Sequence, residues 1–496
     1  MALYRTSLSF SFLAHTQLHE VLFCFLEDQE ILQYRAIHTA CDDVVMHYAQ
    51  VQLADVIGQN LSPMIDDDES DVQQPRRMYA ALVKLMLRCG DDISQVIAAS
   101  GAGVRSIGHR LFEGKHYRSR GNTTGAVFQL LNALKIAPMH ELVYLDVSRP
   151  GLHGAVVSDD GIKLVALNCP HLRALNVDRT QGKVTDESIK FIAMNCLQLE
   201  LLNVRETEGK ITDESMKVVA KKCVRLTSLD VSWTLGVITD EAIKLIATNC
   251  SQLQHLNVKR TGEMVTDQSL RLIATHCTQL RSLDVSWTER RVTDEVIQLV
   301  ATSCPQLQSL NVQHTEGAVT DASIKLVATN CQQLRTLNVS FTEGRIADES
   351  MKLVAANCPK LRSLDVSLTE RRVTDASLKL VAAGCPQLQW LSVRQTHGAI
   401  TDESIKLVAM NCKHLEYLDV SYTEGKITDE SIKLVAVNCL RLRLLGVQST
   451  RGRITDESIK LIAMNCRQLQ RFIFNIADGM ITDDSISLFP PSCDVR

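Results

Sequence analysis

Cysteine is the most regularly placed reactive residue in the sequence. Thirteen of the 16 cysteines recur every 27 residues, from Cys169 and Cys196 to Cys493. Metal sites and disulfides need clustered or complementary thiols, and the sequence contains neither a CxxC nor an HExxH spacing. Equivalent thiols in stacked repeats would scramble in an oxidising compartment. The spacing therefore predicts buried structural thiols, no metal site, and a cytoplasmic or nuclear location.

Carboxylates also recur, in a "TDES" motif that includes Asp186 and Glu187. Paired carboxylates can act as general acid and base, but capping of a helix and solvation explain acids that return in every repeat. The stretch "SGAGVRSIG", residues 100–108, lacks the third glycine of a phosphate-binding loop, and no strand precedes it. No nucleophile elbow or kinase motif occurs. We therefore predict a protein that is not an enzyme and has no cofactor.

Large and charged side chains vary among the repeats, close to one predicted strand. Two places after the strand valine, successive repeats carry Trp233, Arg260 and Trp287. Tryptophan, tyrosine and arginine are typical anchors of protein interfaces, so these positions form a candidate target-binding surface on the concave face. Its members are Arg205, Trp233, Lys259, Arg260, Trp287, His314, Phe341, Trp390, Arg394, Tyr417 and Tyr422. The alternative is that the tryptophans and Phe341 fold over the sheet edge as local packing, because Leu368 and Ile476 share their position.

Each repeat contains one strand and one helix. Leu202 and Val204 alternate like the inward residues of a short strand, and Met216, Val219 and Cys223 follow the spacing of one helix face. Either Thr212 or Asp213 is expected to cap that helix. The residue before each cysteine, usually asparagine and once Gly384, fits a left-handed end of the helix, and a loop glycine such as Gly209 fits a tight turn. One such unit cannot close a core, so the units are predicted to stack.

The LxxLxV core, the trailing helix and the period resemble the leucine-rich-repeat family. The "TD…LVA..C" signature resembles its cysteine-containing subclass, over residues 139–489 and about 13 units of 27 residues. The resemblance implies an α/β solenoid, a horseshoe with a parallel sheet on the concave face and helices on the convex face. Thr180, Thr207 and Thr423 stand where the subclass often has cysteine or asparagine after the strand. We expect threonine to satisfy backbone groups there and to keep the fold.

The N-terminal segment "LFCFLEDQEILQYR", residues 22–35, resembles the two-helix core of an F-box. The resemblance implies an adaptor subunit of cullin-RING ligases as a partner. Its contact residues would be Leu18, Leu22, Phe25, Leu26, Ile31 and Leu32. The alternative is a helical hairpin that merely precedes the solenoid. Three regions follow: an F-box-like helical region (1–58), a linker with an acidic run and helices (59–120), and the solenoid with caps at both ends (121–496).

Composition excludes several functions. The formal net charge is only -4, which gives no basic field for nucleic acid, and no apolar run approaches the roughly 20 residues that span a membrane. The leading hypothesis is a substrate-recognition adaptor of an SCF-type ubiquitin ligase, acting in ubiquitin-dependent protein catabolism. Its alternative is a leucine-rich-repeat scaffold or inhibitor with no ubiquitin role. A GTPase activator would need an arginine on a rim, for which Arg290-Arg291 and Arg371-Arg372 are candidates.

Overall fold

The computed structural model describes residues 106–107, 142–148, 157–475 and 480–495 of the chain. The chain divides into two compact units, Met1–Arg225 and Leu226–Arg496, and each is described by itself. The F-box-like region 1–58, its contact residues from Leu18 to Leu32 and the linker 59–120 lie outside the described residues, apart from one short strand. The boundaries expected for these regions therefore stay predictions.

The first unit alternates short strands with helices of ten residues. Its strands are β1 (Ser106–Ile107), β2 (Tyr144–Asp146), β3 (Ala174–Asn176) and β4 (Leu201–Asn203), and its helices are α8 (Asp159–Asn168), α9 (Asp186–Asn195) and α10 (Asp213–Lys222).

The second unit continues the same alternation. Its strands are β5 (Ser228–Asp230), β6 (His255–Asn257), β7 (Ser282–Asp284), β8 (Ser309–Asn311), β9 (Thr336–Asn338), β10 (Ser363–Asp365), β11 (Trp390–Ser392), β12 (Tyr417–Asp419), β13 (Leu444–Gly446), β14 (Arg471–Ile473) and β15 (Asp494–Val495). Its helices are α11 (Asp240–Asn249), α12 (Asp267–His276), α13 (Asp294–Ser303), α14 (Asp321–Asn330), α15 (Asp348–Asn357), α16 (Asp375–Gly384), α17 (Asp402–Asn411), α18 (Asp429–Asn438), α19 (Asp456–Asn465) and α20 (Asp483–Ile486).

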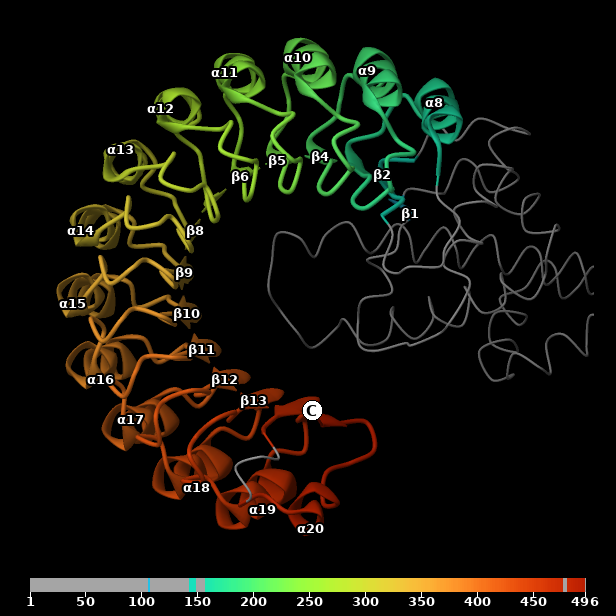
Figure 1. Ribbon diagram of the computed structural model, residues 1–496. Helices are drawn as coiled ribbons and strands as arrows, with labels where there is room; N and C mark the ends of the chain where they lie inside the picture. The colour runs from blue at the N-terminus through green and yellow to red at the C-terminus, as the bar shows by residue number, and fades with distance from the viewer. Residues whose placement is uncertain (1–105, 108–141, 149–156, 476–479, 496) are drawn as a thin grey trace, which may run out of the picture. The chain divides into compact units, whose positions relative to one another are not determined.

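Strands pair in parallel with the strand of the next repeat, at equivalent repeat positions. Ser228 pairs with His255, and His255 pairs with Ser282. In the second unit the strands form a curved sheet on the inner side, and the helices lie on the outer side (Figure 1). Because the register repeats, residues at one repeat position form a row across the sheet. This arrangement confirms the predicted α/β solenoid.

The predicted core is confirmed. Leu202, Val204 and Val219 are fully buried, and so is the Cys223 thiol. Cys196 donates its thiol to the carbonyl of Cys169, 3.5 Å away, one repeat earlier. Burial raises the pKa of the Cys196 thiol to about 12, which keeps it protonated and unreactive. None of the thirteen repeat cysteines forms a disulfide and all are buried, as predicted for structural thiols.

Threonine caps each typical helix, and the aspartate after it joins neighbouring repeats. Thr212 accepts a hydrogen bond from the backbone N of Glu214, which decides between the two cap candidates. Asp186 accepts from the backbone N and Oγ1 of Thr212 at 2.8 and 2.6 Å. One carboxylate therefore stabilises the cap of the next repeat.

The expected left-handed end of the helix is wrong. Asn195 belongs to α9 and donates its side-chain amide to the carbonyl of Phe191 at 2.8 Å. Gly384 is needed for a different reason, because a Cβ there would lie 2.1 Å from the carbonyl oxygen of Ala355 on α15. The predicted loop turn is confirmed, since Gly209 has a φ of 68°. The threonine after the strand acts as expected at Thr207 and Thr423, which donate their hydroxyls to the carbonyls of Val204 and Val420. At Thr180 the expectation is wrong, because its buried hydroxyl has no hydrogen-bond partner among the described residues.

Candidate functional site

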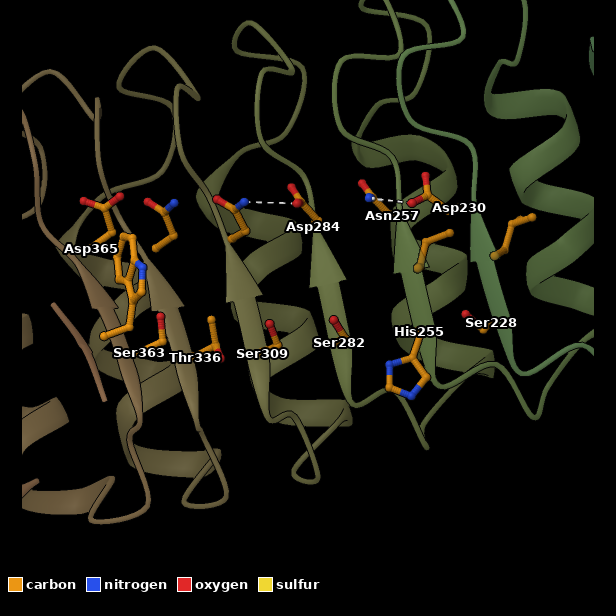
Figure 2. Close-up of a pocket in the computed structure, with 15 residues that line it drawn as sticks. Ser228, Asp230, His255, Asn257, Ser282, Asp284, Ser309, Thr336, Ser363 and Asp365 are labelled. Atoms are coloured by element: carbon orange, nitrogen blue, oxygen red, sulfur yellow. Dashed lines mark hydrogen bonds between the residues drawn. The ribbon is translucent and has the colours of Figure 1, made fainter. Parts of the chain in front are cut away.

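The inner face of the second unit carries a polar hollow. In β5 to β13 the middle leucine is buried, so the first and third residues point to the opposite face of the sheet. Figure 2 shows the two resulting rows, hydroxyl side chains at one end of the strands and carboxylate or amide side chains at the other. They enclose a volume of about 540 Å³. The polar side chains that line it are Ser228, Asp230, His255, Asn257, Ser282, Asp284, Ser309, Asn311, Thr336, Asn338, Ser363 and Asp365, together with Trp390.

Hydrogen bonds hold the row of carboxylates and amides in place. Asp230 accepts the backbone N of Ser232 with one oxygen and the side-chain amide of Asn257 with the other, at 2.9 and 3.0 Å. Asp284 repeats this pattern with Ser286 and Asn311 (Figure 2). These side chains are therefore preorganised, with little rotamer freedom left to lose when a partner binds.

Asp365 is in a different environment. Burial raises the pKa of its carboxyl above 3.8, two hydrogen bonds from Ser367 oppose that rise, and the negative charge of Asp419 adds to it. The strand after Asp365 carries Ser392 in place of an asparagine, and the Ser392 hydroxyl lies 2.7 Å from the Ser367 hydroxyl. Asp365 therefore has no amide donor from that strand.

Five candidate residues two places after the strand valine, from Trp233 to Phe341, form a continuous stack along the edge of the sheet. The guanidinium carbon of Arg260 lies 4.1 Å from the centroid of the Trp233 ring and 5.6 Å from that of Trp287. The Trp287 ring stacks on His314 with centroids 3.9 Å apart, and His314 lies 6.0 Å from Phe341. We call these five residues the rim stack.

Every member of the rim stack has a left-handed backbone, with φ of 59° at Trp233 and 61° at Trp287. Bulky residues rarely adopt this conformation, so the structure must compensate it. The backbone N of Trp233 donates to the carbonyl of Lys259 at 2.9 Å, and the equivalent bond recurs from Trp287 to Gln313. The residue types at this position do not indicate such a backbone, because the position carries many different side chains.

Four of the other candidates, Trp390, Arg394, Tyr417 and Tyr422, form two smaller contacts near the β11 end of the hollow. The Trp390 and Tyr417 rings stack with centroids 4.4 Å apart, and the guanidinium of Arg394 lies 4.8 Å from the Tyr422 ring. Trp390 lines the hollow, whereas the other ten candidates are not among its lining residues. Lys259 is half-buried beside the rim stack, and Arg205 lies in the first unit, 3.9 Å from Glu206. Their role in binding a target stays a prediction.

Several solved structures are similar to this chain. A chain from the crystal structure of the yeast Rad7–Elc1 complex is similar, with 17% identity and a TM-score of 0.58, over 84% of this chain and 96% of that one. An internalin from Listeria monocytogenes matches at 18% identity and a TM-score of 0.39, over 68% and 93% of the two chains. LegL7, a leucine-rich-repeat-containing protein from Legionella pneumophila, matches at 15% and 0.34, over 50% and 83%. No protein-family model and no curated protein matches the chain.

The fold is that of a leucine-rich-repeat solenoid. The likeness to the yeast chain, at 17% identity, shows the fold alone, and the other two, with TM-scores below 0.5, carry no further conclusion. In the described residues no group of three or more histidine, cysteine, aspartate or glutamate side chains is placed to hold a metal ion. The same part of the chain has no helix long and apolar enough to cross a membrane.

The arginine pairs considered for GTPase activation lie among acidic neighbours. Arg290 lies within 3.7 Å of Glu316 and 3.6 Å of Glu343, and Arg371 lies 3.6 Å from Glu424. These arginines are more than half exposed, so such pairs contribute little to stability. The contacts favour the interpretation of solvated loop charge.

Sequence reasoning missed the row of carboxylates and amides in the hollow. Asp230, Asn257 and Asp284 occupy the consensus position between the strand leucine and valine, where the alternation shows only that the side chain does not point into the core. One signal could have revealed this row. The position carries aspartate in some repeats and asparagine in others, and these two side chains have nearly the same shape but differ in charge.

Proposed function

We propose that the chain is a non-enzymatic adaptor that binds a target protein on the inner strand face of its second unit. The observation that carries the proposal is the preorganised polar hollow, which extends from β5 to β11 and is open to a partner. Chemistry would need convergent groups with a nucleophile, acid or base, whereas this hollow offers spaced hydrogen-bonding groups. Spaced groups on a rigid sheet are suited to recognition of an extended surface.

The second part of the proposal concerns the N-terminal region. From the F-box resemblance, Leu22, Phe25 and Leu26 would dock on the small adaptor subunit of a cullin-RING ubiquitin ligase, and the ligase would supply the catalysis. The yeast chain with the similar fold was solved as a complex of Rad7 with Elc1, which supports a protein partner here too. A cytoplasmic or nuclear location agrees with the thirteen free thiols.

Affinity purification read by mass spectrometry tests both parts. The full chain is compared with Phe25→Asp, with a chain lacking residues 1–58, and with Ser309→Trp, which fills the middle of the hollow. We expect Phe25→Asp and the deletion to lose the ligase adaptor while keeping the target, and Ser309→Trp to lose the target while keeping the ligase adaptor. Unchanged thermal unfolding of both point variants is the control for folding.

The second candidate function is a leucine-rich-repeat scaffold or inhibitor without a ubiquitin role. It uses the same hollow and needs no docking by residues 1–58. The purification distinguishes the two functions, because a scaffold would capture its target through the hollow and never capture a cullin-RING adaptor. A wild-type chain that captures neither protein contradicts both.

A further inference from the structure

The hollow of the second unit is acidic. Three of its lining residues are carboxylates, Asp230, Asp284 and Asp365, and none is lysine or arginine. His255 lines it too. Although the residue is exposed, partial desolvation of the ring and then the positive charge of Arg281 lower its pKa below 6.5, which disfavours the charged form at pH 7. The lining therefore carries net negative charge at physiological pH.

The shape of the hollow fits an extended segment with long side chains. Its floor is made of small hydroxyl residues on four successive strands: Ser282, Ser309, Thr336 and Ser363. The larger His255 on β6 and Trp390 on β11 flank this floor, and Ser228 on β5 lies beyond His255. The six strands from β6 to β11, at a spacing of about 4.8 Å, make the stretch between these two side chains roughly 24 Å long, which is the length of about seven extended residues.

The carboxylates differ in how far the protein already satisfies them. Asp230 and Asp284 each accept an asparagine amide, whereas Asp365 faces Ser392 on the following strand. Asp419, one strand further on, adds a like charge nearby. A cation at Asp365 would relieve both the desolvation and the repulsion.

We propose that the segment bound in this hollow is a basic one, whose lysine or arginine side chains pair with Asp284 and Asp365. This inference rests on the proposed function, because it names the chemistry of the target that the same face binds. Asp284 and Asp365 lie three strands apart, roughly 14 Å along the sheet, so two basic residues about four positions apart can reach both. Charge complementarity of this kind favours a basic partner and excludes acidic competitors.

Fluorescence anisotropy with the full chain tests the proposal. The probes are fluorescein-labelled octalysine and octaglutamate, measured in low salt and again in high salt because screening weakens ionic contacts. Octalysine is expected to bind and octaglutamate is not. The double variant Asp284→Asn with Asp365→Asn keeps the shape and the acceptor oxygens, and should weaken octalysine binding about tenfold, the effect of roughly 1.4 kcal/mol.

A matched control removes two charges from the outer helices. Glu349→Gln with Glu403→Gln changes side chains that are 64% and 68% exposed, on α15 and α17. This variant should bind octalysine within about twofold of the wild type. Three results would overturn the proposal: octaglutamate binding as well as octalysine, an unchanged affinity in the Asp variant, or an equal loss in the Glu variant.

The outcome is separable from that of the proposed function. If Ser309→Trp loses its target in the purification but octalysine fails to bind the wild type, the hollow binds a target of other chemistry. The basic segment is then wrong and the adaptor function stands. If Ser309→Trp also keeps every captured protein, both proposals fail.

Discussion

Thr212 joins two repeats by donating its hydroxyl to Asp186, with 2.6 Å between the two oxygens. The same hydroxyl oxygen caps α10 by accepting from the backbone N of Glu214. A single threonine thus fixes a helix start and the register between neighbouring units. In the described repeats this threonine is replaced by Ser158 before α8 and by Ala347 before α15, and neither helix has a side-chain cap. Ala347 keeps only the bond from its backbone N to the Asp321 carboxylate, at 2.9 Å.

Restoring this threonine should stabilise the chain. Ala347→Thr supplies the missing cap and a second hydrogen bond to Asp321, worth about 1 kcal/mol. The reciprocal change Thr374→Ala, one repeat later, should cost about the same amount. Urea unfolding followed by circular dichroism measures both, and equal midpoints for Ala347→Thr and the wild type would contradict this account of the cap.

Two aspartates should respond in opposite ways to neutralisation. For Asp159, burial raises the pKa, but hydrogen bonds from Ser188 and Thr185 outweigh it and leave the pKa below 3.8. Its charged form therefore stabilises the fold above about pH 4, and this contribution is lost as the pH falls through the lowered pKa. Asp365 has a raised pKa, so its charged form opposes folding at neutral pH.

Unfolding midpoints at pH 7 and pH 3.5 check this difference. Asp159→Asn should lower the midpoint at pH 7 and flatten the acid-side loss of stability. Asp365→Asn should leave the midpoint at pH 7 unchanged or raise it. A large loss of stability at pH 7 in Asp365→Asn would show that its charge supports the fold instead of serving a partner.

Leu235 stores strain on the surface. Its φ is 57° and its side chain is 71% exposed, so it has the backbone of a glycine and gains little from packing. Leu235→Gly should stabilise the chain by about 1 kcal/mol, because it removes the left-handed penalty. Leu197, which is 53% exposed and has no left-handed backbone, is the matched control and should lose stability on the same change. A loss of stability in both variants would contradict the backbone strain assigned to Leu235.

The rim stack should contribute to stability even without a partner. The Trp287 ring lies between Arg260 and His314, so Trp287→Ala removes two ring contacts worth about 1 kcal/mol together. Thermal unfolding of the free chain measures this loss. An unchanged midpoint combined with lost target binding would instead identify Trp287 as an interface anchor.

The repeat thiols should be unreactive in the folded chain. Burial raises the pKa of Cys412 and of Cys439 to about 12, so almost no thiolate exists at pH 8. A chromogenic disulfide reagent should titrate at most three of the 16 thiols in native buffer and all of them in denaturant. Rapid reaction of more than three thiols in the native chain would contradict the burial of the repeat cysteines.

Most of the fold follows from the sequence, because one spacing repeats. Leu202, Val204 and Val219 were placed inward by periodicity alone, and stacking in register was the only way for such a unit to close a core. The hydrogen bond between Asp186 and Thr212 was not predicted, since a pattern within one repeat cannot show which residue of the next repeat a side chain contacts.

The candidate site was harder to predict. Trp233 and Trp287 were recognised as unusual, but the left-handed backbone that sends them along the sheet edge depends on hydrogen bonds to the next repeat. Asp284 and Asp365 looked like ordinary strand residues, and only the parallel register gathers them into one hollow.

Site-specific photocrosslinking tests the central claim most directly. A photoreactive phenylalanine replaces Ser309 on the floor of the hollow, or Lys352 on the outer helix α15, in the full chain expressed in cells. The account predicts a discrete crosslinked protein from position 309 and none from position 352. Crosslinks from position 352 alone would place the partner on the helices and contradict a binding face made by the strands.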